Sequence, residues 1–185
     1  TYVSTKYDNV KTVEALYLAH MMKEKGYGEV LELAKQTKGQ NIRYHFAGSW
    51  KYEESRAEFF EFVEEHGLED QVIYHGFVSG DEKASLFKNA HLLLYPSKND
   101  AFPLTLLESL SYGVPVIATD EGSIPYILDE KSGIVLNNIN TLPEALEQAK
   151  QTLITKEIAK HCRQRYENNF SLEQFEDNLV KTLKG

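Results

Sequence analysis

The sequence predicts an α/β domain built on a Rossmann-like, doubly wound parallel sheet of about six strands, with C-terminal helices. Short, continuously apolar runs alternate along the chain with segments of helical periodicity. The runs lack polar–apolar alternation, which is typical of strands that are covered on both faces. The chain has 185 residues, 42% of them hydrophobic and 26% charged, which is enough for one core but not for two. We therefore expect one domain.

Six apolar runs are expected to form the strands, and short connections between them favour right-handed βαβ units. The runs are Ala15–Leu18, Ile42–Ala47, Val72–His75, His91–Tyr95, Val114–Ala118 and Ile134–Leu136. Helical patterns separate them, around Val30–Ala34, Phe59–Val63, Ala84–Phe87 and Leu104–Leu110. From about residue 141 the pattern is helical to the end, and Ser171 with Gln174 predicts a capping box before the last helix.

Composition excludes several classes of protein. The chain has a formal net charge of −8 and no basic block, which argues against nucleic-acid binding. No apolar run approaches the roughly 20 residues that span a bilayer, and no signal peptide opens the sequence. Cys162 is the single cysteine, so no internal disulfide is expected and a reducing compartment is favoured. We expect a cytoplasmic protein, with peripheral contact at the inner face of a membrane as an alternative.

The stretch after the fourth expected strand carries the candidate site, because ligands of doubly wound sheets bind beyond the carboxyl ends of the strands. Pro103 suits the first position of a helix, where a missing N–H costs nothing. The free amides of Leu104 and Thr105 would then point out of the helix N-terminus, where the helix dipole also favours an anion. This pattern predicts a phosphate-binding site.

Two carboxylates flank this predicted phosphate site. Asp100 precedes the helix, and Glu108 lies one turn beyond Leu104 on the same helix face. Carboxylates beside an anion site suit a ligand that has hydroxyls as well as phosphates, as a sugar nucleotide does. The simpler alternative is that Asp100 is a turn residue and Glu108 is solvated, although a carboxylate among so many leucines needs a partner.

The run from Asp100 to Asp120 resembles the donor-binding signature of retaining glycosyltransferases of family 4, the group 1 glycosyl transferases of GT-B fold. That signature has two glutamates separated by seven residues, followed by a Gly-x-Pro-Val-x-Ala-(Ser/Thr)-Asp strand. Asp100 and Glu108 have this spacing, and the strand follows as Gly113-Val-Pro-Val-Ile-Ala-Thr-Asp120. Similarity extends to Phe46-Ala-Gly48, His75-Gly-Phe-Val78 and Gly122-Ser-Ile-Pro125. The chain departs from the signature where Asp100 replaces the first glutamate, where Ser123 replaces a glycine, and where Tyr126 replaces a frequent glutamate.

The family also places a basic pair after the first strand, Arg and then Lys five residues later, with Gly after the Lys. Lys6 and Lys11 have the spacing but lack the glycine. His20 and Lys25 have the spacing, and Gly26 follows, so this second register is preferred. Here His20 replaces the Arg, so any charge at that position depends on pH. The alternative is that Lys25 is a solvated loop lysine.

The resemblance implies roles for these residues. Lys25, with His20 and the amides of Leu104 and Thr105, would hold the donor diphosphate. Glu108 would accept hydrogen bonds from the ribose and Asp100 from the sugar, and Val78 would meet the base through its backbone. Phe102 belongs to the same donor-binding run, and Lys25, Asp100 and Glu108 are the candidate catalytic residues. No metal and no other cofactor is expected, and Cys162 and the histidines show no catalytic or metal-ligand spacing.

The resemblance also implies that the chain is the C-terminal, donor-binding half of a larger enzyme. Residues 1–14 would lead in from an N-terminal domain, and residues 15–185 would form the nucleotide-sugar-binding domain. The whole enzyme, of hexosyltransferase type, would transfer a sugar from a nucleotide diphosphate sugar to an acceptor hydroxyl with retention. The saccharide or lipid-linked acceptor, and any peripheral membrane contact, would belong to the missing half, so this chain alone is expected to be inactive. A sugar-nucleotide 2-epimerase-like enzyme and a non-catalytic nucleotide-binding module remain alternatives.

Overall fold

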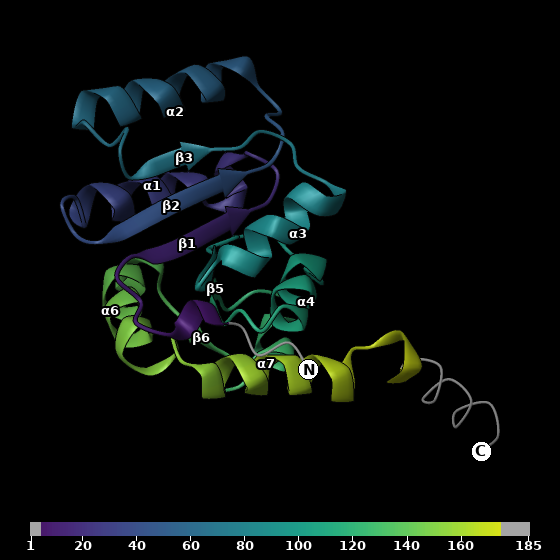
Figure 1. The fold of residues 1–185 in the computed structure, drawn as a ribbon. Coiled ribbons are helices and arrows are strands. Elements are labelled where there is room, and N and C mark those ends of the chain that lie inside the picture. The colour runs from purple at the N-terminus through teal and green to yellow at the C-terminus, as the bar shows by residue number, and fades with distance from the viewer. Residues whose placement is uncertain (1–4, 175–185) are drawn as a thin grey trace.

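A computed structural model describes residues 5–174 and shows one six-stranded, all-parallel sheet in the order β3-β2-β1-β4-β5-β6 (Figure 1). This is the Rossmann strand order, and the predicted α/β class is confirmed. The chain moves outward from β1 to β3 and then returns to the other side of β1, so β1 and β4 are neighbours at the switch point. The strands are β1 (Val13–Leu18), β2 (Ile42–Ala47), β3 (Val72–Tyr74), β4 (Leu92–Tyr95), β5 (Val116–Thr119) and β6 (Gly133–Leu136).

Helices cover the sheet on both faces, because right-handed crossovers that run in opposite directions from the switch point lie on opposite faces. The first core cluster packs α1, α2 and α6 on one face, and the second packs α3, α4, α5 and α7 on the other. The helices are α1 (Tyr27–Gln36), α2 (Glu53–His66), α3 (Gly80–Asn89), α4 (Leu104–Ser111), α5 (Ile124–Ile127), α6 (Leu142–Thr152) and α7 (Lys156–Asn169). Short 3₁₀ helices lie at η1 (Thr5–Tyr7), η2 (Lys23–Lys25) and η3 (Ile139–Thr141).

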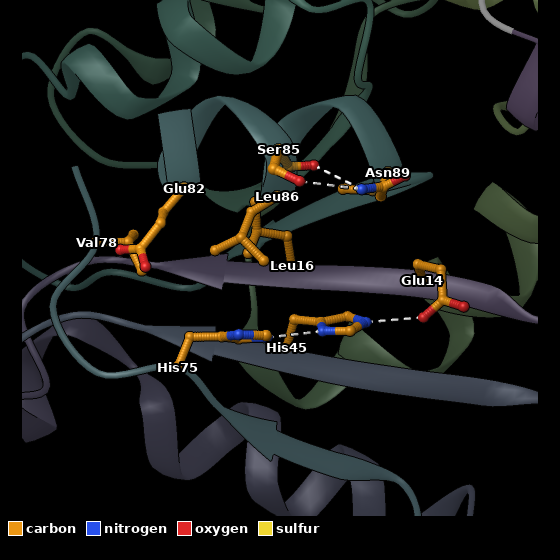
Figure 2. Close-up of a pocket in the computed structure, with 10 residues that line it drawn as sticks. Glu14, Leu16, His45, His75, Val78, Glu82, Ser85, Leu86 and Asn89 are labelled. Carbon is orange, nitrogen blue, oxygen red and sulfur yellow. Dashed lines mark hydrogen bonds and ion pairs between the residues drawn. The ribbon is translucent and has the colours of Figure 1, made fainter. Parts of the chain in front are cut away.

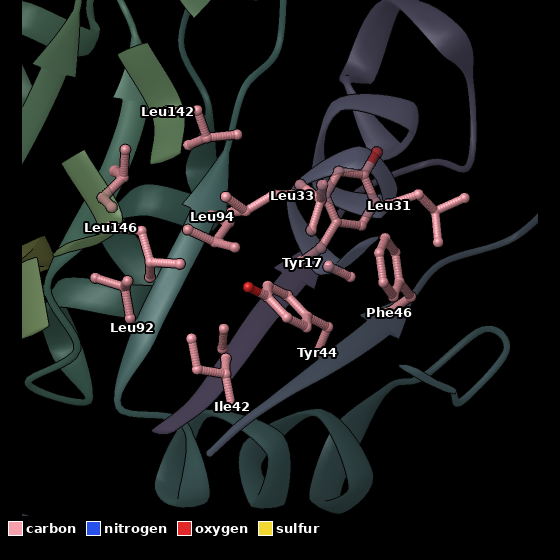
Figure 3. Packing of buried hydrophobic residues seen from close by; sticks show 14 of the residues in the cluster. Tyr17, Leu31, Leu33, Ile42, Tyr44, Phe46, Leu92, Leu94, Leu142 and Leu146 are labelled. Carbon is pink, nitrogen blue, oxygen red and sulfur yellow. The ribbon is translucent and has the colours of Figure 1, made fainter. Parts of the chain in front are cut away.

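Large side chains on alternate strand positions build the first core. Tyr17, Tyr44 and Phe46 are almost fully buried between the sheet and α1 (Figure 3). The Tyr44 hydroxyl lies 2.7 Å from Thr37 Oγ1, so this buried polar group has a partner. Burial raises the pKa of Tyr44 to about 12, and the hydroxyl therefore stays protonated.

The strand ends differ slightly from the sequence prediction. β5 begins at Val116 rather than Val114, because Pro115 has no N–H to donate to the sheet. The carbonyl of Pro115 still accepts from Leu93 N at 2.9 Å. β3 ends at Tyr74 and β4 begins at Leu92, each one residue inside the predicted strand.

β1 begins at Val13 rather than Ala15, so the predicted division after residue 14 falls inside this strand. Val13 and Glu14 pair with Ile42 and Arg43 of β2. The preceding segment also packs on the domain, since the Tyr7 hydroxyl donates to Gly113 O at 2.8 Å. The sequence argument missed these strand positions because the charged Glu14 interrupts the apolar run.

The last described residues confirm the first hydrogen bond of the capping box that was expected before the last helix. Ser171 Oγ accepts from Gln174 N at 3.3 Å, and the rest of the predicted last helix lies outside the described residues. Before it, α7 crosses α4, and its Arg165 donates to Tyr126 O and Ile127 O at the end of α5. α7 therefore packs against α4, the helix whose first turn belongs to the candidate site.

Candidate functional site

The predicted phosphate site lies at the beginning of α4, just beyond the carboxyl end of β4. Leu104 is the first helical residue and is 66% exposed, so the first-turn amides of Leu104 and Thr105 are at a helix terminus. Pro103 is the N-cap and not the first helical residue, because its ψ of 106° is extended. Its carbonyl nevertheless accepts from Leu106 N at 3.1 Å, as expected of an N-cap residue. The arrangement suits an anion.

Lys25 lies against the loop that leads into this helix. Its Nζ donates to Asp100 Oδ2 at 2.7 Å and to Asn99 O at 2.8 Å. The structure thus brings together the cation and the first carboxylate that the sequence had singled out, from positions 75 residues apart. Lys6, the competing candidate, donates instead to Phe87 O.

The two loops that carry Lys25 and Asp100 are docked on each other. Lys98 N donates to Glu24 O at 2.8 Å, which joins the loop after β4 to the loop after β1. Gly26 has φ +82°, and a Cβ there would lie 2.2 Å from Pro96 O. A glycine is therefore required after Lys25 both by the left-handed backbone and by the close approach of the second loop.

Asp100 is held by more than Lys25. Its Oδ2 also accepts from the Tyr95 hydroxyl at 2.7 Å and from Ser97 Oγ at 2.9 Å, and the side chain is only 16% exposed. Burial alone would raise the pKa of Asp100, but the hydrogen bonds from Lys25, Tyr95 and Ser97 outweigh burial and lower it. The carboxylate is therefore charged. The sequence analysis missed Tyr95 and Ser97, although both lie at the end of a strand, where the search for the site was directed.

Glu108 has the partner that its apolar surroundings require. Lys83 Nζ, from α3, donates to Glu108 Oε1 at 2.6 Å, and the two side chains are 33% and 38% exposed. Glu108 is neither buried alone nor fully solvated. No sequence spacing points to Lys83, because the contact depends on how α3 and α4 pack.

The remaining predicted residues lie around this centre. His20 is exposed in the loop after β1, and its Nδ1 lies 3.2 Å from Ser49 Oγ in the loop after β2. Phe102 is 48% exposed in the loop before α4. These positions place His20 and Phe102 at the carboxyl edge of the sheet, but within residues 5–174 the hydrogen bonds of the Lys25 side chain go to Asn99 and Asp100 and not to either of them.

Val78 lies beside a separate groove, of about 370 Å³, between α3 and a part of the sheet that no helix covers (Figure 2). In the groove, Glu14, His45 and His75 form a hydrogen-bonded row across β1, β2 and the end of β3. His45 Nε2 lies 2.7 Å from Glu14 Oε2, and His45 Nδ1 lies 2.9 Å from His75 Nε2. Burial, with the neighbouring His45, lowers the pKa of His75.

Within residues 5–174, no group of three or more histidine, cysteine or acidic side chains is arranged to hold a metal ion. In the same part of the chain, none of the helices has the length and apolar character needed to cross a bilayer. Cys162 is buried, and burial raises the pKa of its thiol to about 12, which makes it a poor nucleophile.

A comparison with protein families decides the identity of the domain. The sequence model of the glycosyl transferases group 1 matches residues 6–171, almost the whole chain. The chain belongs to this family. The resemblance that was seen in the run from Asp100 to Asp120 is thereby confirmed for group 1 glycosyl transferases.

Known proteins agree with this assignment of the chain as a group 1 glycosyl transferase domain. The chain is 27% identical over 187 residues to WcaL of Escherichia coli K12, which is named as a candidate colanic acid biosynthesis glycosyltransferase. The match covers 94% of this chain but 45% of WcaL, so the chain spans about half the length of this relative.

Solved structures show the same fold. HepE of Anabaena, crystallised with UDP, matches with a TM-score of 0.83 at 16% identity, over 94% of this chain and 49% of HepE. The C-terminal domain of the group 1 glycosyl transferase LpcC of Francisella tularensis matches with a TM-score of 0.76 at 20% identity, over 92% of this chain and 94% of that domain. The chain therefore has the Rossmann-like α/β fold of these glycosyltransferase structures, and it corresponds to about half of the HepE chain.

Proposed function

We propose that this domain binds the donor of a hexosyltransferase, a nucleotide diphosphate sugar, and that the whole protein transfers the sugar to an acceptor hydroxyl with retention. The observation that carries the proposal is the fixed ammonium of Lys25, which Asp100 and Asn99 hold against the loop that leads into α4. The ammonium and the first-turn amides form a binding site for a diphosphate. The solved complex of HepE with UDP supports a nucleotide of this kind.

In the reaction, the bond between the anomeric carbon and the terminal phosphate oxygen breaks, and negative charge grows on the departing diphosphate. Lys25 and the amides of Leu104 and Thr105 would stabilise this charge, and they are already in place before the donor binds. Because this stabilisation comes from the chain itself, we propose that no metal ion is needed. Donor binding should then be unchanged when EDTA is added.

Glu108 would bind the ribose hydroxyls. Its Oε1 is paired with Lys83, and the half-exposed side chain leaves the other oxygen available to a ligand. Asp100 would contact the sugar through Oδ1, because all three hydrogen bonds described above end on Oδ2. The loop that would receive the base lines the groove beside Val78.

We expect Glu108→Ala to weaken binding of the preferred donor by about 1–3 kcal/mol, because the bound hydroxyls lose their acceptor. The measurement is a calorimetric titration with UDP-, GDP- and ADP-sugars, first with the unchanged chain to find the donor and then with the variant. Glu147→Ala is the matched control, since Glu147 also pairs with a lysine, Lys150, but on α6. Equal affinities of the Glu108 variant and the unchanged chain would contradict the ribose role. Failure of the unchanged chain to bind any of the three donors would contradict the proposed function.

A further inference from the structure

The Tyr95 and Ser97 hydroxyls form a buried cluster around the carboxylate that holds Lys25. Asp100 Oδ2 accepts from three donors, the Tyr95 hydroxyl, Ser97 Oγ and Lys25 Nζ, at 2.7, 2.9 and 2.7 Å. Lys25 in turn gives a second hydrogen to Asn99 O. An ammonium has three hydrogens, so this arrangement uses two and leaves one. The direction of that remaining N–H is fixed by the groups that hold the other two.

We propose that Tyr95 and Ser97 are positioning residues for the diphosphate, and that they act through the carboxylate of Asp100 on Lys25. The inference rests on the proposed function and adds two residues that the donor-binding signature does not assign. Asp100 then positions Lys25, whether or not its second oxygen also contacts the sugar.

The cluster is anchored in the middle of the sheet. Tyr95 is the last residue of β4, which lies between β1 and β5, and it is 4% exposed. Ser97 is fully buried, and its carbonyl accepts a hydrogen bond from the Thr119 hydroxyl at the end of β5. Of the two hydroxyls that bind Asp100, one therefore comes from a central strand and the other from a buried loop residue that is tied to β5, and accurate placement of a ligand-binding group requires support of this kind.

The protonation states of Tyr95 and Asp100 also favour this positioning role. Burial, followed by the hydrogen bond to Asp100 and its negative charge, raises the pKa of Tyr95, so the phenol stays protonated and remains a donor. The pKa of Asp100 is lowered, so its carboxylate remains an acceptor for all three groups. Neither group changes its protonation state near neutral pH, and the geometry around Lys25 is maintained.

The test measures how tightly the Tyr95→Phe variant binds UDP or GDP, whichever of the two the unchanged chain binds more tightly. This change removes the hydroxyl and keeps the ring. We expect the diphosphate affinity to fall about fivefold, less than for loss of the ammonium itself, because Lys25 stays but is less well placed. Binding of the corresponding nucleoside, which has no phosphate, should be unchanged. Tyr44→Phe is the matched control, a buried tyrosine that loses its hydrogen bond to Thr37 far from the site, and it should bind both ligands as the unchanged chain does.

A double-mutant cycle separates positioning from a general loss of structure. In a Lys25→Met background, Tyr95→Phe should cost no further affinity, because the group that it positions is gone. A fivefold loss in both backgrounds, or an equal loss of nucleoside binding, would overturn the inference. Ser97→Ala repeats the test should Tyr95→Phe fail to fold, and an unchanged diphosphate affinity in the folded variant would also overturn it. If the unchanged chain binds no diphosphate, the proposed function fails; if Lys25→Met weakens binding and the hydroxyl variants do not, only this inference fails.

Discussion

Lys25→Met should lower the affinity for the nucleoside diphosphate about 100-fold, the largest loss we expect from one side chain of the site, because a charge-assisted contact contributes about 1.5–3 kcal/mol. The substitution keeps an unbranched apolar side chain, one atom shorter, and removes the ammonium. It also leaves the carboxylate of Asp100, 16% exposed, without its counter-charge and close to the incoming phosphates. Calorimetric titration with the preferred diphosphate measures the effect.

Two comparisons separate the contact with the ligand from a general effect on the domain. Lys23→Met removes a lysine of the same 3₁₀ helix that pairs with the exposed Glu58, and it should leave binding unchanged. The unpaired carboxylate in Lys25→Met should also lower the free energy of unfolding. Adding Asp100→Asn removes this charge, so the free energy of unfolding should return towards that of the unchanged chain while the diphosphate affinity stays low. Near-normal binding by Lys25→Met would show that the diphosphate is held elsewhere.

Gly26→Ala should both destabilise the domain and abolish diphosphate binding. The new Cβ would lie 2.2 Å from Pro96 O, so the loop after β1 has to separate from the loop after β4. The left-handed backbone at φ +82° adds about 1 kcal/mol of strain for a residue other than glycine. We expect the free energy of unfolding to fall by about 2–4 kcal/mol, and Lys25 to move with its neighbour away from Asp100.

Gly39→Ala provides a close control for this prediction. Gly39 has nearly the same φ, +81°, but nothing lies within 4 Å of the added Cβ. It should therefore show the strain of the left-handed backbone alone, and its ligand binding should be normal. Denaturant unfolding and titration of both variants give the comparison, and equal behaviour of the two would mean that the close approach of the loops has no part in stability or binding.

The fold and the centre of the site could be predicted because both depend on local patterns. Continuous apolar runs indicate buried parallel strands, and the parallel sheet then brings Lys25 and Asp100 to the same edge. Gly26 was the local signal that selected Lys25 over Lys11. The structure gives this signal a physical basis in the contact with Pro96.

The parts that were missed depend on packing between distant elements. Lys83 reaches Glu108 only because α3 and α4 are neighbours, and the row of Glu14, His45 and His75 exists only because three strands align side by side. Tyr95 was predicted only as the last residue of a strand, and its hydroxyl has this partner only because Asp100 folds back over the end of β4. The roles of His20, Val78 and Phe102 towards a ligand remain predictions.

The ion pair between Lys25 and Asp100 has a consequence for how an anion reaches the site. The ammonium already has its counter-ion, and the whole chain carries a net charge of −8, so a diphosphate approaches through a repulsive long-range field. Attraction begins only at contact distance, where the peptide dipoles of α4 act. Moderate ionic strength screens the distant repulsion more than it weakens those short contacts, and capture of the nucleotide should be faster in physiological salt than in dilute buffer.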